Sequence, residues 1–527
     1  MTKLNLEVPE QSCARKPLDI IAESVSLRGE KRYQEALERL EEGSSADPAS
    51  LPLLVEKGIV LFELGRCEEA IECFDQFLKW SGNAQVRQLR EMCLKHALAN
   101  CELRVAQDRE SVEPLLKRAD ILERLRRYEE AVRDYSAAMA IRANEFATIL
   151  NKRANVLLDL DRPEDALAGY DRALEFLPFN GSLQYNRANV LHKLSRMEEA
   201  IAGYDRALEL KPDLAEAKME RSHCRLAMGD FERGFAEYES RWEITRLKYA
   251  KSRLPQPLWL GKENLEGKTI VLWAEQGYGD TLHFLRYVPL VARIAGKTVV
   301  RVAPCLQTLA QSLECKVSVI SSVEVLPAHD FNCPLMSLPL AFATRLESIP
   351  ADIPYLRAEP AQVEKWKARL GEASRPRIGL VWAGNRREPV NHTRDMRLEM
   401  FAPLMNLDAD IISLQKEVGD EDRPALASMA QIAPLGEELS DFADTAALIE
   451  NLDLVISVDT AVAHLAGALG KPVWIMLRYS GEWRWLLGRQ DSPWYPTAKI
   501  FRQKTPGDWA GLICELVRQL GDWSKKS

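Results

Sequence analysis

Small and apolar residues recur along the first half of the chain with a long, fixed period. The segments RYEEAVRDYSAAMAI (127–141), RPEDALAGYDRALEF (162–176) and RMEEAIAGYDRALEL (196–210) align with one another at intervals of 35 and 34 residues. A period of this length predicts a repeated helix–turn–helix unit, with the small residue at the close contact between its two helices. That position is occupied by Ala36, Ala70, Ala131, Ala166, Ala200 and Gly234.

The repeats resemble the tetratricopeptide repeat, since Pro178 and Pro212 also follow the second helix of their units. The resemblance covers about residues 17–242 and predicts a repeat domain over 1–244. Between Ala70 and Ala131 the spacing is 61, and 84–112 is interpreted as one shortened helical repeat. Such units bury their apolar faces only by stacking, which predicts a superhelix whose concave groove is a binding surface.

A polar position also repeats in the first helices of these units. The motifs KRANVL and NRANVL place Asn155 and Asn189 in register, with Asp120 one repeat earlier and His223 one repeat later. The pattern resembles the asparagine ladder of the O-linked N-acetylglucosamine transferase superhelix, where amides hold an extended peptide by its backbone. A carboxamide suits this role because it both donates and accepts. The resemblance implies acceptor binding by these four residues; the alternative is solvated residues that duplication propagated without use.

The second half of the chain has a different pattern. The segment 245–267 contains several prolines and glycines and is expected to be a linker. Beyond it, buried strands alternate with helices, which is typical of a parallel sheet. The expected strands lie at 270–274, 298–304, 377–385 and 410–415. They predict two α/β lobes, at 268–374 and 375–527, the second ending in a returning C-terminal helix.

The stretch DLVISVDTAVAHLAGALGKPVWIML (453–477) is the most informative part of this half. It predicts a strand, a turn at Asp459 and Thr460, a helix ending at Gly470 and another strand. Asp and Thr are capping residues, and a helix that starts at the carboxyl end of a parallel strand offers a site for phosphate. His464 lies one turn further along; the alternative for this residue is a packed structural histidine.

Composition and other motifs exclude several classes of protein. The 70 basic and 78 acidic residues leave a net charge of −8, so nucleic acid is not an expected partner. No apolar run is long enough to span a bilayer, and the first twenty residues lack an apolar core, so a cytoplasmic location is expected. A dinucleotide-binding GxGxxG motif fails because position 282 is Leu, and a P-loop fails because position 262 is Lys.

Several separate motifs carry a resemblance to one enzyme family. SVDTAVAHLAGALGKPV resembles the donor-site motif of the heptosyltransferase-like glycosyltransferases (family nine, GT-B fold), and WAEQGYGDTLHFLRY resembles their N-terminal loop. RIGLVWAGN, SLQK and WRWLLGRQDSPWYP extend the resemblance over about 268–520, to a bacterial subgroup in which the transferase follows tetratricopeptide repeats. It implies two Rossmann-like lobes with a nucleotide-sugar between them. Some members resemble flagellin glycosyltransferases, which implies a protein acceptor.

The resemblance implies roles for individual residues. Asp280 is the candidate general base, with Gly277 and Gly279 allowing close approach of the backbone to a ligand. The alternative is that Asp280 only caps the following helix. Cations on the second lobe would balance the leaving diphosphate in place of a metal ion, with Arg394 and Arg397 both open for this role. The implied donor-binding residues are Gly277, Gly279, Asn385, Arg394, Arg397, Gln415, Lys416, Asp459, Thr460 and His464.

The sequence therefore predicts a metal-independent, inverting glycosyltransferase without a cofactor, which moves a sugar from a nucleotide-sugar to a protein held by the repeats. One alternative is an interaction scaffold with an inactive transferase domain. Another is a heptosyltransferase-like enzyme that acts on a saccharide or lipid-linked acceptor. The sugar, its nucleotide, the acceptor and the oligomeric state are left open by the sequence.

Overall fold

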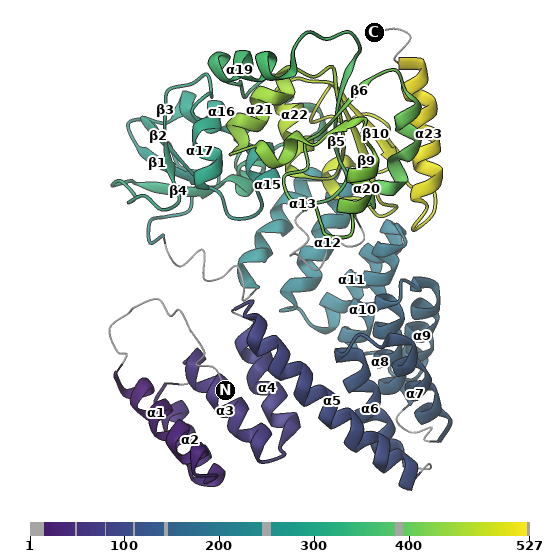
Figure 1. Cartoon of the computed structure of the whole chain (residues 1–527). Helices are drawn as coiled ribbons and strands as arrows, with labels where there is room; N and C mark the ends of the chain where they lie inside the picture. The colour runs from purple at the N-terminus through teal and green to yellow at the C-terminus, as the bar shows by residue number, and fades with distance from the viewer. Residues whose placement is uncertain are drawn as a thin grey trace. The chain divides into compact units, whose positions relative to one another are not determined.

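The computed structural model describes residues 15–47, 50–79, 81–108, 111–141, 146–244, 254–384 and 394–523. They fall into two compact units, with bounds 1–183 and 184–527. The first contains helices only among its described residues, and the second contains the last repeat helices together with both sheets (Figure 1). The division lies within the array of repeats, not at the predicted boundary near residue 244.

The predicted helix–turn–helix repeats are present, which confirms the solenoid part of the fold. Within the first unit, consecutive helices pack against one another. The helices of the array are α1 (Arg15–Gly29), α2 (Tyr33–Ala46), α3 (Leu51–Glu63), α4 (Cys67–Leu78), α5 (Ala84–Gln107), α6 (Val112–Arg124), α7 (Tyr128–Ile141), α8 (Phe146–Asp159), α9 (Pro163–Phe176), α10 (Gly181–Lys193), α11 (Met197–Leu210), α12 (Ala215–Ala227) and α13 (Phe231–Tyr238), followed by the 3₁₀ turn η2 (Glu239–Glu243).

The periodic small residues lie in the interior of the repeats. The five alanines of the series have no exposed surface. The turns follow the same period, since one residue between the two helices has a left-handed backbone conformation. These residues are Gly65, Asp161, Ser195 and Gly229. Two glycines adopt this conformation readily, whereas a residue with a Cβ does so at a cost of roughly 1 kcal/mol.

The irregular stretch between Ala70 and Ala131 is helical, as expected, but its form differs from a repeat. One 24-residue helix, α5, stands there in place of a helix pair. It packs against α4 on one side and α6 on the other. Asn83 caps its start by accepting from the N–H groups of Gln85 and Val86, at 2.9 and 3.2 Å. A single helix therefore accounts for the shortened spacing.

The first lobe is built on a four-stranded parallel sheet in the order β3-β2-β1-β4. Part of the predicted linker belongs to this lobe, because Leu258 pairs with Asn332 of β4 and the Trp259 N–H donates to the Asn332 carbonyl at 2.8 Å. The elements are β1 (Thr269–Trp273), α15 (Tyr278–Phe284), η3 (Leu285–Tyr287), α16 (Val288–Ile294), β2 (Lys297–Val302), α17 (Pro304–Ala310), β3 (Val317–Ser321), β4 (Phe331–Pro334), η4 (Leu335–Ser337), α18 (Leu338–Ala341), η5 (Leu346–Ser348) and α19 (Pro360–Leu370).

The second lobe has a six-stranded parallel sheet in the order β10-β9-β8-β5-β6-β7. Its central strands β5, β8 and β9 are fully buried, as expected for continuous apolar runs covered on both faces. The elements are β5 (Arg377–Val381), η7 (Leu398–Asn406), β6 (Asp410–Ser413), α20 (Arg423–Ser428), β7 (Ile432–Ala433), η8 (Leu435–Glu438), α21 (Phe442–Glu450), β8 (Leu454–Val458), α22 (Ala461–Ala468), β9 (Val473–Leu477), η9 (Trp483–Trp485), β10 (Ala498–Arg502) and α23 (Trp509–Trp523).

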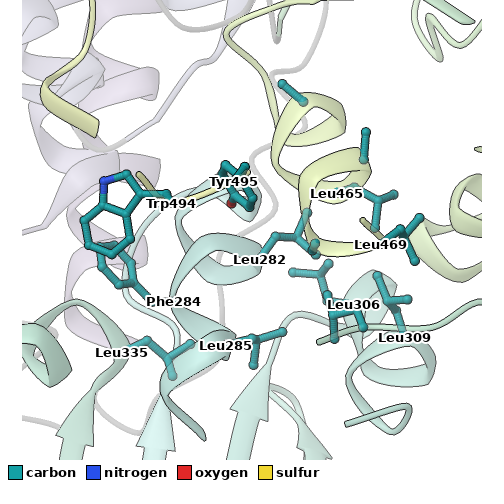
Figure 2. Packing of buried hydrophobic residues seen from close by; sticks show 14 of the residues in the cluster. Leu282, Phe284, Leu285, Leu306, Leu309, Leu335, Leu465, Leu469, Trp494 and Tyr495 are labelled. Carbon is teal, nitrogen blue, oxygen red and sulfur yellow. The ribbon is translucent and has the colours of Figure 1, made fainter. Parts of the chain in front are cut away.

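One apolar core joins the two lobes and the end of the repeat array. Figure 2 shows Leu282 of α15 beside Leu465 of α22 and Leu469, the residue that follows this helix, with leucines of α17 close by. Phe231 and Phe235 of α13 belong to the same core, where their rings lie 5.7 Å from those of Trp494 and Trp483. The C-terminal helix α23 packs into a second core, on the other face of the six-stranded sheet.

Candidate active site

Both sheets change direction at a point where a ligand can be held. In the first sheet β1 lies between β2 and β4, and in the second β5 lies between β6 and β8. The connections leave such central strands toward opposite faces, which opens a crevice at their carboxyl ends. The loop to α15 leaves β1 at this edge, and the turn to α22 leaves β8. The fold therefore directs Asp280 and the Asp459–Thr460 turn toward one region.

Helices α15 and α22 pack directly on one another, and Gly279 makes this contact close. A Cβ at Gly279 would lie 3.0 Å from Cδ2 of His464 and 3.5 Å from Cα of Ala461. The residue is needed for its small size, because only glycine leaves room for the start of α22. The two predicted motifs, GYGD and DTAVAH, are thus brought together.

We expect Gly279→Ala to destabilise this unit by about 1–3 kcal/mol, because the added methyl group presses α22 away from α15. Gly521→Ala is a matched control, since a Cβ at Gly521 meets nothing within 4 Å. Calorimetric unfolding of the intact chain measures both. Equal melting temperatures for the two variants would contradict the close packing.

Asp280 makes two contacts. One carboxylate oxygen accepts from the Gly277 N–H at 3.0 Å, so Asp280 does cap α15, as the alternative interpretation held. The other oxygen accepts from Nη2 of Arg484, which comes from the second lobe. The side chain remains 22% exposed. Capping and ion pairing therefore fix the carboxylate at the crevice without closing it off.

Arg484 is the main site residue that sequence reasoning missed. Its guanidinium is buried, lies 4.4 Å over the Trp483 ring and donates to Glu482 at 3.2 Å. Burial disfavours its charge, yet the carboxylates of Asp280 and Glu482 raise its pKa above the ordinary value. Its Nε has no hydrogen-bond partner among the described residues. An orphaned, buried N–H on a permanent cation is a group that an anionic ligand would satisfy.

His464 is a neutral, packed histidine. Its ring stacks on Trp485 with centroids 5.1 Å apart, and its Nδ1 lies 3.0 Å from the Tyr495 hydroxyl. Burial, with the positive charge of Arg484 nearby, holds its pKa well below the usual range. It therefore carries no charge near neutral pH with which to balance a diphosphate, and its packing agrees with the structural alternative.

Tyr495 also contacts a second buried histidine, His283, whose Nδ1 lies 3.0 Å from the same hydroxyl. One hydroxyl hydrogen can serve only one of the two rings, so the other ring must donate. His283 Nε2 has no partner among the described residues, and an unpaired acceptor costs less than an unpaired donor. This assigns the His283 proton to Nδ1. The His464 Nε2 lies 3.9 Å from the Asp459 carboxylate.

Asp459 and Thr460 occupy the predicted turn, but Thr460 does not cap α22 with its side chain. Its hydroxyl instead lies 2.9 Å from that of Ser457. This leaves the first N–H groups of α22 without a side-chain cap from that residue. The pKa of Asp459 is raised because its carboxyl is buried and close to Glu482, although Arg394 and Arg484 act in the opposite direction.

The predicted basic residues separate into two groups. Arg394 lies against Gly384, where a Cβ would be 2.5 Å from its Nη2, and its charge acts on Asp459 and Glu482. Arg397 instead donates to the Glu421 carbonyl at 2.9 Å and faces Asp422 at 3.4 Å. Of the two arginines that the sequence left open, Arg394 is the one beside the Asp459 turn.

Gln415 and Lys416 are held by the protein backbone. The Gln415 side chain accepts from the Ala383 N–H and donates to the Glu417 carbonyl, both at 3.1 Å, which ties the ends of β5 and β6 together. Lys416 donates to the Ser440 carbonyl at 2.6 Å. Asn385, the remaining predicted donor residue, lies outside the described residues.

The predicted ladder residues are paired with tyrosines of the following helix. In the first unit, the hydroxyls of Tyr135 and Tyr170 donate to Asp120 and Asn155, and Lys152 also binds Asp120 at 2.7 Å. In the second unit, the Tyr204 hydroxyl donates to Asn189 at 2.8 Å. The carbonyl oxygens of Asn155 and Asn189 are thus occupied within their own repeats.

His223 differs from the other members of the series. Its Nδ1 lies 3.5 Å from the Glu220 carboxylate, and its ring is 5.6 Å from that of Tyr238. Glu220 raises its pKa, although burial acts in the opposite direction. Glu482 contributes to the same shift, so His223 belongs electrostatically to the surroundings of Arg484.

The described residues contain neither a metal-binding cluster nor a membrane-spanning helix. No three His, Cys, Asp or Glu side chains gather there as they would around a metal ion. None of the described helices combines the length and apolarity needed to cross a bilayer.

Family models match segments in both halves of the chain. Tetratricopeptide-repeat models match residues 27–93 and 151–215, and the glycosyltransferase family 9 (heptosyltransferase) model matches residues 431–506. The last range runs from β7 to β10 and carries Asp459, Thr460, His464 and Arg484.

The individual proteins that resemble this chain share a low sequence identity with it. Protein FlbA of Caulobacter vibrioides is 24% identical over 316 residues, which cover 55% of this chain and 52% of FlbA. The chain thus spans about half the length of this curated relative. Similar solved structures include YrrB, a repeat protein with an unusual peptide-binding site (15% identity, 42% of this chain, 100% of YrrB, TM-score 0.25). A tetratricopeptide repeat protein of Parabacteroides merdae (16%, 45% and 96%, TM-score 0.28) and MamA (16%, 37% and 96%, TM-score 0.21) are others.

Proposed function

We propose that this chain, which joins tetratricopeptide repeats to a C-terminal glycosyltransferase family 9 domain, moves a sugar from a nucleotide-sugar to a hydroxyl group of a protein acceptor. The observation that carries the proposal is the meeting of Asp280, Arg484 and the start of α22 at the carboxyl ends of β1 and β8. A carboxylate from one lobe stands there beside cations from the other.

The proposed reaction is a single displacement. Asp280 takes the proton of the acceptor hydroxyl, and the oxygen forms a bond to the anomeric carbon of the donor. The bond between that carbon and the phosphate oxygen breaks at the same time, and its electron pair leaves with the nucleotide. Attack opposite to the leaving group inverts the anomeric configuration. Arg394 and the N–H groups of α22 balance the charge that develops on the phosphate, so the proposal needs no metal ion.

The orphaned Nε atoms of Arg394 and Arg484 support an anionic donor at this site. Both are buried and have no hydrogen-bond partner among the described residues. Two permanent cations would favour phosphate over a neutral ligand, because guanidinium groups form strong charge-assisted bonds to it. The neutral His464 would not act as a cation.

We expect Arg394→Ala to weaken nucleotide binding by about 1.5–3 kcal/mol, through loss of a charge-assisted bond. This corresponds to a factor of roughly 10–150 in Kd. Arg397→Ala is the matched control, since its guanidinium is turned to Glu421 and Asp422. Calorimetric titration with ADP, GDP, UDP and CMP in turn identifies the nucleotide and measures the change. If Arg394→Ala bound the nucleotide as the wild type does and Arg397→Ala bound it more weakly, Arg397 would be the phosphate-binding residue in place of Arg394.

A protein acceptor is proposed from the repeats, which form stacked surfaces suited to binding other proteins. The resemblance to flagellin glycosyltransferases makes flagellin the first candidate, and the reaction would then take place in the cytoplasm. The test is co-expression of flagellin with the chain, followed by intact-mass measurement of the flagellin. A mass increase equal to one or more sugar residues, absent with Asp280→Asn, is the expected result.

The same experiment separates the alternatives. A scaffold with an inactive transferase domain would bind its partner without adding mass to it and without consuming a nucleotide-sugar. An enzyme for a saccharide or lipid-linked acceptor would turn over the donor but leave the protein unmodified.

A further inference from the structure

The end of the repeat array is joined to the transferase by a buried ionic contact. Arg241 of η2 has no exposed side-chain surface, and neither has its partner Glu275. Glu275 lies in the loop between β1 and α15, two residues before Gly277, the N-cap of α15. A residue of the repeats thus holds the segment that carries Asp280.

Every N–H group of Arg241 donates a hydrogen bond, either to Glu275 or to a residue beside it. Nε donates to Glu275 at 3.1 Å, and Nη2 donates to Glu275 at 3.3 Å and to Ser337 at 2.7 Å. Nη1 donates to Glu239 at 2.6 Å and to the Tyr238 carbonyl at 3.2 Å. The guanidinium also lies over two rings, 4.7 Å from the centroid of Tyr238 and 4.4 Å from that of Trp242. Its position is therefore fixed in all directions, which suits a planar fork better than a lysine ammonium.

A second bond holds the next residue of the same loop. The Gln276 side chain donates to the Tyr238 hydroxyl at 2.9 Å. Both residues that lead into α15 are thus held from the repeat side, Glu275 by Arg241 and Gln276 by Tyr238. The Gly277 N–H then binds Asp280, so the position of the carboxylate follows from that of the loop.

We infer that Arg241 and Tyr238, at the end of the repeat array, are positioning residues for the catalytic loop, and that the last repeat is a required part of the active site. The inference rests on the proposed role of Asp280. A misplacement of about 1 Å at a reacting group is enough to slow a reaction roughly a hundredfold. Burial raises the pKa of Glu275 to about 7 in spite of Arg241, so loss of the arginine would leave this carboxyl in its uncharged form.

The test uses Arg241→Lys and Tyr238→Phe in the intact chain, which keep the charge and the ring while removing the fork and the hydroxyl. Arg221→Lys is the matched control for the first, because Arg221 is also partly buried and paired, but with Asp205 and Glu237 inside the repeats. Tyr287→Phe is the control for the second, since its hydroxyl contacts Thr344 within the first lobe. Each variant is measured by hydrogen exchange of residues 274–284, by calorimetric titration with the nucleotide found above, and by turnover.

We expect exchange in 274–284 to become about tenfold faster or more in Arg241→Lys and Tyr238→Phe, as in other locally loosened segments. Turnover should fall at least about tenfold, with nucleotide affinity unchanged within about a factor of two, because Arg394 and the start of α22, which hold the phosphate in the proposal, lie on the second lobe. The control variants should match the wild type in all three measurements.

Two different results would contradict the inference, one for the positioning role and one for its effect on catalysis. Unchanged exchange in both variants overturns the positioning role, whatever the turnover. Faster exchange with wild-type turnover overturns the catalytic consequence of the contact, whereas the role of Asp280 as the base is tested separately by Asp280→Asn.

Discussion

Asp280→Asn is expected to reduce sugar transfer by about a factor of 10²–10⁴, the range that general-base catalysis contributes. The substitution keeps an oxygen that can accept from the Gly277 N–H, so α15 should still begin at its present residue. It removes the charge that accepts the proton and pairs with Arg484. The measurement is turnover of the nucleotide-sugar in the presence of the acceptor, together with nucleotide affinity, which should stay unchanged.

Asp491→Asn is the matched control for this variant, because Asp491 forms an exposed ion pair with Arg489 in the same unit. It should retain full turnover. Near-normal transfer by Asp280→Asn would remove the general-base assignment and favour a scaffold or a different base.

Arg484→Met is expected to have the largest effect on stability, with a loss of about 3–5 kcal/mol, as when one partner of a buried ion pair is removed. Asp280 and Glu482 would lose their shared partner, and the buried Asp459 carboxyl would lose a nearby positive charge. Arg484→Lys should recover part of the stability by restoring the charge. It should still slow transfer, because an ammonium cannot bind both carboxylates in the geometry of the guanidinium.

Thermal unfolding and turnover of both variants distinguish these effects. Arg489→Met provides the comparison, since its surface pair with Asp491 contributes at most about 1 kcal/mol. Equal melting temperatures for Arg484→Met and Arg489→Met would show that the ion pairs of Arg484 with Asp280 and Glu482 do not stabilise the fold as their burial indicates.

The repeats and the strand–turn–helix segment at 453–477 could be predicted because each is a contiguous pattern. LVISV and PVWIML are apolar runs of strand length, and β8 and β9 lie within one residue of the expected bounds. The 34-residue period likewise requires nothing beyond the order of residues along the chain. For such elements, local pattern and final packing agree.

The site could be predicted only in part, because its contacts join irregular segments far apart in sequence. Arg484 lies in a 3₁₀ turn without a helical or strand period, and 204 positions separate it from Asp280. The motif WRWLLGRQDSPWYP contains both Arg484 and Tyr495, but no spacing rule indicates which of its side chains turns toward α15. The predicted cap by Thr460 was wrong because the nearby Ser457 hydroxyl competes for its side chain.

Helix α13 and both lobes share one core, which limits where repeats can be exchanged between such proteins. Phe231, Phe235 and Tyr238 are buried among residues of the transferase, so exchange of the α12–α13 pair would disrupt a core optimised for this partner. Earlier repeats contact mainly their neighbours in the array. A chimera that exchanges repeats should therefore be joined upstream of α12, and duplication or loss of repeats during evolution should be tolerated in that same upstream part.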